Sequence, residues 1–348
     1  MAAKLKPIRE QTIVITGASS GIGLATAEEA ARRGAKVVLN SRDEIDLQRA
    51  IATIRAAGGT ALHVVGDVAE IDTMTEVAET ALREFGGIDT WINNAGVSIY
   101  GRIEDVPVED ARRLFDTNYW GVVNGSLIAL QYLRKHGGGA LINLGSVLSE
   151  TGYPLQGHYA ASKHAVKGFT DSLRIELEKD DAPIVVTLIE PAAINTPYPN
   201  HARNYLLSEP KHAPPVYDPS VVADAILACA ERPHRNLRIG GGAKMFTVME
   251  KVAPSLSDRL KLSHFEQQHA DAPPRDEDTL YAPRPGDASI RGEYPGHVMK
   301  SSVYTAVAKR PKISAATALG LAALGIGFLA VRNRSTESSH RKRTAAGR

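Results

Sequence analysis

The sequence predicts an α/β fold, a doubly wound parallel sheet with helices on both faces, followed by an extended C-terminal arm and an apolar segment. Short β-branched apolar runs alternate with helical patterns of ten or more residues as far as about residue 245. This alternation is typical of strand–helix–strand units, whose right-handed crossovers cover both faces of a parallel sheet. A glycine-rich turn directly after the first apolar run supports the same fold.

The predicted elements follow one another in a regular order. Residues 12–17 (TIVITG) read as a buried strand, and the helical pattern of 21–34 ends at a glycine. Further strands are predicted at 36–40, 61–68, 89–96, 140–146, 184–191 and 237–242, and further helices at 47–59, 76–87 and 158–178.

The chain changes character after this series. Residues 264–312 are polar and contain several prolines, which predicts a linker or an extended arm, partly disordered. Residues 313–331 carry no charge and would span about 28 Å as a helix, close to the thickness of a bilayer core. We expect a membrane anchor there; a buried Ala-rich helix or a partner-docking segment are the alternatives. The expected parts are 1–250 (the α/β domain), 251–312 (extension), 313–331 (transmembrane helix) and 332–348 (basic tail).

Composition excludes several function classes. The 348 residues have a formal net charge of +2, which gives no electrostatic support for a nucleic-acid partner. The single cysteine, Cys229, rules out an internal disulfide and fits a buried small residue in a reducing compartment. The N-terminus shows no secretory signal pattern, and no group of His, Cys and Asp has the spacing of metal ligands.

The stretch TGASSGIG (16–23) leaves the first strand and opens a helix. Gly17 permits a tight turn, and Gly21 and Gly23 allow a ligand to approach the backbone closely. Free N–H groups at the start of a helix favour a pyrophosphate. The stretch therefore predicts dinucleotide binding, and it is not a P-loop because no Gly-Lys-Ser/Thr follows.

Tyr159 and Lys163 stand four residues apart in HYAASKH, and on a helix they share one face. A free tyrosine has a pKa of about 10, and a nearby cation lowers it. Such a tyrosine can exchange a proton near neutral pH. Alone the pair is a common coincidence, so its meaning depends on the other motifs.

TGASSGIG, NNAG (93–96), Asn118, Ser146 and YAASK (159–163) occur together and in this order. With these motifs, residues 8–245 resemble the short-chain dehydrogenase/reductase family in its compact single-domain branch. The resemblance implies a Rossmann-type sheet, a nicotinamide cofactor, reversible oxidation of an alcohol to a carbonyl, and a homodimer or homotetramer.

The resemblance also implies roles for matching residues. Tyr159 would be the general acid/base, and Ser146 would hydrogen-bond the substrate oxygen. Lys163 would lower the tyrosine pKa and hold the nicotinamide ribose, while Asn118 would support a water chain to Lys163. The cofactor would contact Tyr159, Lys163 and the residues Gly17, Ser19, Ser20, Gly21, Ile22, Gly23, Ser41, Arg42, Asp67, Val68, Asn94, Ala95, Gly96, Pro191 and Thr196. In PAAINTP (191–197), Ala192 replaces the family's usual glycine.

The end of the second strand, VVLNSRDE, bears on the choice of cofactor. An NAD enzyme usually has an acid there to bind the ribose 2′-hydroxyl. Ser41 takes that place, and Arg42 can pair with a 2′-phosphate, so we expect NADP. Asp43 and Glu44 follow directly and leave NAD open.

Residues 197–217 are expected to form a substrate lid, rich in proline and partly apolar. Together with the anchor, the lid suggests a lipophilic carbonyl/alcohol substrate, fatty, steroid-like or polycyclic. One alternative is a membrane-recruited, cofactor-binding scaffold with little catalysis; another is a nucleotide-sugar epimerase or dehydratase. We expect a membrane-associated protein with its catalytic domain on the cytoplasmic side, or a cytoplasmic one if residues 313–331 do not insert.

Overall fold

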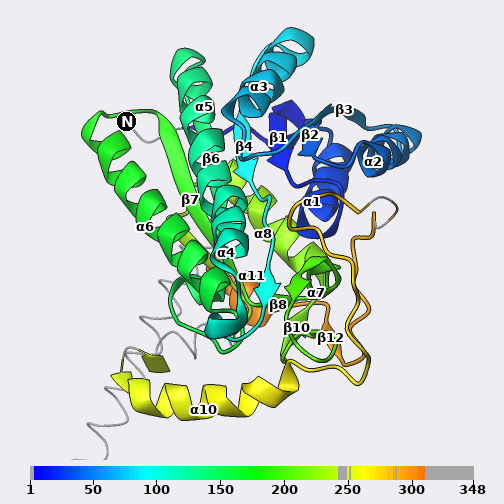
Figure 1. The fold of residues 1–348 in the computed structure, drawn as a ribbon. Coiled ribbons are helices and arrows are strands. Elements are labelled where there is room, and N and C mark those ends of the chain that lie inside the picture. Colours follow the sequence, from blue (N-terminus) through cyan, green and yellow to red (C-terminus); the bar gives the residue numbers. More distant parts are fainter. Residues whose placement is uncertain (1–3, 242–248, 251, 285, 287, 310–348) are drawn as a thin grey trace, which may run out of the picture. The chain divides into compact units, whose positions relative to one another are not determined.

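The structure is a computed structural model that describes residues 4–241, 249–250, 252–284, 286 and 288–309. Its centre is a seven-stranded parallel sheet with the strand order β11-β7-β6-β4-β1-β2-β3 (Figure 1). The strands are β1 (Thr12–Thr16), β2 (Lys36–Ser41), β3 (Thr60–Val65), β4 (Thr90–Asn93), β6 (Gly139–Leu144), β7 (Ile184–Pro191) and β11 (Asn236–Ile239). The predicted doubly wound α/β fold is therefore confirmed.

Helices cover both faces of this sheet (Figure 1). One face carries α1 (Gly21–Arg32), α2 (Glu44–Ala56) and α8 (Pro219–Glu231), and Cys229 of α8 is buried as expected. The other carries α3 (Ile71–Phe85), α5 (Gly121–Lys135) and α6 (Gly157–Lys179), with α4 (Val108–Phe115) packed on α6. Fully buried strand residues such as Val14, Val38 and Trp91 pack with residues of α3 and α5 in one core cluster. Burial on both faces explains why the centres of these strands are runs of consecutive apolar residues, such as 13–15 and 37–39.

The strand order reverses between β1 and β4, because β2 and β3 lie on one side of β1, and β6, β7 and β11 lie beyond β4. Open α/β sheets bind ligands in the crevice at such a reversal, beside the carboxyl ends of the strands. The turns after β1 and β4 meet there. Gly17 has φ +62°, and a Cβ on it would stand 2.6 Å from the Cα of Ala95. Only glycine allows this approach.

Short elements extend the carboxyl end of the sheet. The segment after β7 contains β8 (Ala193–Ile194), α7 (Tyr198–His201), β9 (Arg203–Asn204) and β10 (Val216–Tyr217). Strand β9 pairs with β5 (Ile99–Tyr100), whereas β10 lies between β8 and β12 (Val298–Met299) in a three-stranded parallel sheet. The last strand of that sheet thus comes from the C-terminal extension.

The extension differs from the linker that its composition predicts. It contains α10 (Pro254–Gln267), β12 and α11 (Val303–Ala308), and Leu280 is fully buried. Residues Met1–Thr305 form one compact unit and Ala306–Arg348 a second. Hydrogen bonds of Thr279, Ser289 and Arg291 attach the extension to the α/β domain, although most of its residues between 271 and 301 are exposed.

The predicted membrane anchor, residues 313–331, lies outside the described residues. In the part of the chain that is described, no helix has the length and apolar character needed to cross a bilayer.

Candidate functional site

The glycine-rich turn leads into α1 without a side-chain cap. The N-cap residue, Ser20, makes no capping hydrogen bond, so its side chain does not occupy the N–H groups at the helix start. Gly21 (φ +54°) lies close to Thr196, which a Cβ would meet at 3.3 Å. Gly23 packs against Gly17 and Asn94, whose side-chain amide donates to the carbonyl oxygens of Thr16 and Gly17. The N–H of Gly21 is bonded to the carbonyl oxygen of Ser289 at 2.9 Å, but no side chain caps the helix, and the glycines let a ligand approach the backbone. The predicted cofactor residues therefore fit a dinucleotide.

A cavity lies along this turn and the end of β2. Its lining includes most of the predicted cofactor residues, namely Gly17, Ser19, Ser20, Gly21, Ile22, Ser41, Arg42, Asp67, Val68, Asn94, Ala95, Gly96 and Thr196. Gly23 packs behind the turn, and Pro191 lines the neighbouring cavity. The hydroxyls of Ser19 and Ser41 are 2.9 Å apart.

The charges at the end of β2 are held in specific contacts. Arg42 is partly buried, and burial lowers its pKa, although it remains a cation at neutral pH. Asp67 accepts a hydrogen bond from the guanidinium of Arg113, and Arg42 lies 3.9 Å from the same carboxylate. Asp43 is the N-cap of α2 and accepts the N–H of Asp46 at 3.0 Å.

A second cavity is lined by three of the four predicted catalytic residues, Ser146, Tyr159 and Lys163, whereas Asn118 is not among its lining residues. Tyr159 and Lys163 lie on one face of α6, and Ser146 follows β6, where its Oγ accepts the N–H of Leu148. The side chains of Ser146 and Tyr198 lie near the Tyr159 hydroxyl and act to lower its pKa, and the Tyr159 and Tyr198 rings meet edge to face with centroids 5.5 Å apart. The two cavities share Ile22, Asn94, Gly96, Thr196 and Tyr198. A dinucleotide along the glycine turn would therefore end beside Tyr159.

The pKa of Tyr159 is raised, whereas the positive charge of Lys163 alone would lower it. Burial raises it above the ordinary tyrosine value, and the polar side chains of Ser146 and Tyr198 beside the hydroxyl offset this only in part. The Nζ of Lys163 lies 5.7 Å from the centroid of the Tyr159 ring and donates to the carbonyl oxygen of Leu144 at 2.9 Å. Lys163 is 4% exposed, and burial lowers its pKa to about 8. Desolvation thus outweighs the attraction of the ammonium for a phenolate in this structure.

Asn118 lies in a π-helical turn, Asp116–Trp120, between α4 and α5. Its side chain is fully buried and bonds both backbone groups of Val97, accepting the N–H at 2.8 Å and donating to the oxygen at 3.0 Å. It also donates to Ser162 Oγ at 3.1 Å. A Cβ on Gly96 would stand 3.3 Å from Asn118 Oδ1 and 3.7 Å from Lys163 Nζ. Gly96 therefore separates these two polar groups without filling the space between them.

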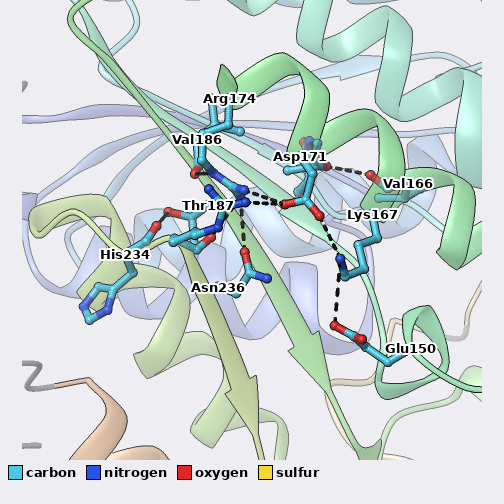
Figure 2. A network of polar contacts seen from close by, with 12 residues as sticks. Glu150, Val166, Lys167, Asp171, Arg174, Val186, Thr187, His234 and Asn236 are labelled. Carbon is cyan, nitrogen blue, oxygen red and sulfur yellow. Dashed lines mark hydrogen bonds and ion pairs between the residues drawn. The ribbon is translucent and has the colours of Figure 1, made fainter. Parts of the chain in front are cut away.

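Helix α6 is fixed to the sheet by polar contacts beyond its catalytic turn (Figure 2). Arg174 donates to the carbonyl oxygen of Val186 at 3.1 Å, to Asp171 at 2.6 Å and to Asn236 of β11 at 3.2 Å. Lys167 pairs with the same Asp171 at 2.7 Å. These contacts join α6 to β7 and β11, which restrains the helix that carries Tyr159 and Lys163.

The second cavity also contains side chains to which the sequence assigned no polar role. The Tyr198 hydroxyl lies 2.7 Å from Ser98 Oγ and 3.2 Å from Gln156 Oε1, and its ring stacks on His212. Burial lowers the pKa of His212 to about 4, so this imidazole is neutral. No motif marks these residues; only the fold brings them to Tyr159.

The C-terminal extension closes one side of this cavity. His264 at the end of α10 lies 2.8 Å from the hydroxyl of Tyr153, and Gln268 accepts from Gln156 at 2.9 Å. Both residues of the extension line the cavity. Within the described residues, no cluster of His, Cys, Asp or Glu could hold a metal ion.

Comparisons with known proteins agree with this site. The family model for short chain dehydrogenase matches residues 11–205. The chain is 45% identical over 325 residues to the uncharacterized oxidoreductase YxnA of Bacillus subtilis, covering 92% of this chain and 91% of that one. It is 35% identical over 192 residues to 3beta-hydroxysteroid dehydrogenase 1 of Eggerthella lenta, covering 55% and 73%.

A solved structure shares the fold. A short-chain dehydrogenase from Streptomyces avermitilis superposes with a TM-score of 0.60 at 26% identity, covering 73% of this chain and 97% of that one. Because the family model spans more than half of the chain and the first relative matches nearly all of it, the chain belongs to the short-chain dehydrogenase/reductase family and is an oxidoreductase of alcohol and carbonyl groups that uses a nicotinamide cofactor.

Proposed function

We propose that this enzyme uses NADP to interconvert the carbonyl and alcohol forms of a lipophilic substrate, with Tyr159 as the general acid/base. The observation that carries the proposal is the placement of Tyr159, Ser146 and Lys163 in one cavity that shares five lining residues with the glycine-turn cavity. A bound nicotinamide would supply or accept the hydride. The protein would handle the proton and the developing charge on oxygen.

In the reducing direction, Tyr159 donates its proton to the carbonyl oxygen, and Ser146 donates a hydrogen bond to the same oxygen. The raised pKa of Tyr159 keeps the phenol protonated before reaction. Lys163, with its Nζ on the Leu144 oxygen, is close enough to stabilise the phenolate that results. Asn118 fixes the backbone of Val97 through two hydrogen bonds. It would also support a water chain that brings a proton back to Tyr159.

Arg42 supports the choice of NADP. It lines the glycine-turn cavity as a cation beside Ser41, where an NAD enzyme would have an acid. Asp43 lines the same cavity, but one of its oxygens caps α2. Glu44 is solvent-exposed and lies outside the residues that line the cavity. The remaining contacts of a bound cofactor would be those of the predicted set, with Thr196 and Pro191 expected at the nicotinamide end.

The lining of the second cavity supports a lipophilic substrate. Aromatic and aliphatic side chains dominate around Tyr159, among them Tyr100, Leu148, Tyr153 and Pro214. The name of the Eggerthella lenta relative, a 3beta-hydroxysteroid dehydrogenase, is consistent with a polycyclic alcohol.

The test is a substrate screen with the full chain, purified with detergent present. NADPH consumption is followed with ketosteroids, fatty aldehydes, polycyclic ketones and small sugars, and Tyr159→Phe is the control for each hit. Turnover of lipophilic carbonyls that vanishes in Tyr159→Phe supports the proposal. Turnover of small polar sugars alone would exclude the lipophilic substrate, and cofactor binding without any turnover would favour the scaffold.

Three expectations remain proposals. They are the division of the chain into parts after residues 250, 312 and 331, the membrane anchor at 313–331, and a homodimer or homotetramer. Membrane flotation of the full chain against a variant lacking 313–348 tests the anchor. Light scattering of the detergent-free variant tests the oligomer.

A further inference from the structure

Residues 279–292 of the C-terminal extension, here called the strap, cross the glycine-turn cavity; residues 285 and 287 within it are not described. The strap is outside the matched region of the family model, which ends at residue 205. The match to the Bacillus subtilis relative covers 92% of this chain and must therefore include it. Figure 1 shows the extension passing beside α1 and α2.

Hydrogen bonds hold the strap to the cofactor site at both of its ends. Arg42 donates to the carbonyl oxygens of Thr279, Leu280 and Tyr281. At the other end, Ser289 accepts the N–H of Gly21, the first residue of α1, at 2.9 Å.

Two further contacts fix the strap. The N–H of Gly286 lies 3.2 Å from the carboxylate of Asp46, and Arg291 donates to Asp218 at 2.7 Å. The strap is thus attached to α2, to α1 and to the N-terminus of α8, and it forms a wall of the cavity.

The strap supplies a cation to this wall. Thr279, Pro283 and Arg284 line the cavity together with Ser41 and Arg42. The Nε of Arg284 lies 3.2 Å from Glu277, whose side chain is 72% exposed. Its Nη1 is buried and has no hydrogen-bond partner within the described residues. An unsatisfied buried N–H is unfavourable, so we expect a bound ligand to accept a hydrogen bond from this donor.

The other cation of the cavity is already engaged. Arg42 shares its terminal nitrogens among three strap carbonyls and lies 3.9 Å from Asp67. A 2′-phosphate carries close to two negative charges and needs more than one charge-assisted donor. Because Arg42 shares its donors with the strap, it can supply only part of these contacts. The unpartnered Nη1 of Arg284 can supply a further one.

From these contacts we infer that Arg284 is a specificity-determining residue of the cofactor site, a second cation for the 2′-phosphate of NADP that the strap delivers. Two carboxylates of the wall do not cancel it, because Asp67 is paired with Arg113 and Asp46 with Arg49 at 3.2 Å. Asp43 caps α2 with Oδ1, whereas its Oδ2 is buried without a hydrogen-bond partner within the described residues. The inference rests on the proposed use of NADP, and it adds that the discrimination depends on a part of the chain outside the family's common domain.

The test measures binding and not turnover. Dissociation constants of NADPH, NADH, 2′,5′-ADP and ADP are determined by calorimetry or fluorescence for the full chain and for Arg284→Gln, Arg284→Lys and Arg275→Gln. Arg275 is the matched control: it belongs to the same extension, pairs with Glu209 and Glu293, and does not line this cavity.

Arg284→Gln should weaken NADPH and 2′,5′-ADP by about tenfold, the loss of one charge-assisted contact. NADH and ADP should change less than twofold, Arg284→Lys should lie between, and Arg275→Gln should match the unaltered chain. Equal losses for phosphorylated and unphosphorylated ligands, or no loss at all, would overturn the inference. If the unaltered chain itself shows no preference for NADPH over NADH, the proposed use of NADP fails, and the inference fails with it. A preference that Arg284→Gln leaves intact removes only the inference.

Discussion

Lys163 is a buried ammonium whose placement should reduce the stability of the cofactor-free fold. It is 4% exposed, its Nζ donates to the Leu144 oxygen at 2.9 Å, and burial lowers its pKa from 10.5 to about 8. A shift of this size corresponds to about 3 kcal/mol against the folded state at pH 7, at about 1.36 kcal/mol for each pKa unit. Replacing the side chain by methionine removes that cost and leaves the Leu144 oxygen without this donor, which costs about 1 kcal/mol. Lys163→Met should therefore raise the free energy of unfolding by about 2 kcal/mol at pH 7.

The pH dependence identifies the cause. Between about pH 8 and 10.5 the unfolded chain holds the lysine proton that the folded chain has lost, so the unaltered protein becomes more stable as pH rises through this window. The advantage of Lys163→Met should shrink by about 2 kcal/mol between pH 7 and pH 9.5. Urea unfolding of both proteins without cofactor, at the two pH values, measures this difference. An advantage that does not depend on pH, or a loss of stability at pH 7, would refute the reasoning.

Other substitutions test the remaining roles. Tyr159→Phe should lower turnover by about a thousandfold or more while NADPH binding stays within about threefold, since only the proton carrier is lost; single-turnover kinetics and fluorescence titration separate the two, and appreciable turnover would contradict the role. Arg42→Ala should weaken NADPH at least about tenfold more than NADH, measured by titration; equal losses would remove the argument for NADP. Asn118→Ala breaks the contacts with Val97 and Ser162 and should cost about 2–3 kcal/mol in urea unfolding, with an unchanged unfolding midpoint as the contrary result.

Local sequence patterns were sufficient for the sheet and for the glycine turn. The strands of a parallel sheet are buried on both faces, so they stand out as continuous apolar runs, and the turn is marked by glycines whose φ values other residues rarely adopt. Residues 44–56 illustrate the limit. The periodicity suggested a helix from 47, but the helix begins at Glu44 because Asp43 caps it.

The extension could not be predicted in the same way. Residues 279–292 are polar and contain proline and glycine, which is also the composition of a solvated linker. What distinguishes them is the set of partners, such as Arg42 and Gly21, which stand more than two hundred residues earlier in the chain. The same holds for the partners of Tyr159. Tyr198 carries no motif, and the direction of the Tyr159 pKa depends on burial, which the spacing of Tyr159 and Lys163 does not show.

The hydrogen bond from Arg42 to the Thr279 carbonyl joins residues 237 positions apart. At about 5–20 residues per second, a ribosome needs roughly 12–47 s to make the intervening chain. During that time the glycine turn and the first strands can already have formed, while one wall of their cavity has not been synthesised. A nascent chain of this protein would therefore pass through a period in which it has the family's common domain but not its own finished cofactor pocket.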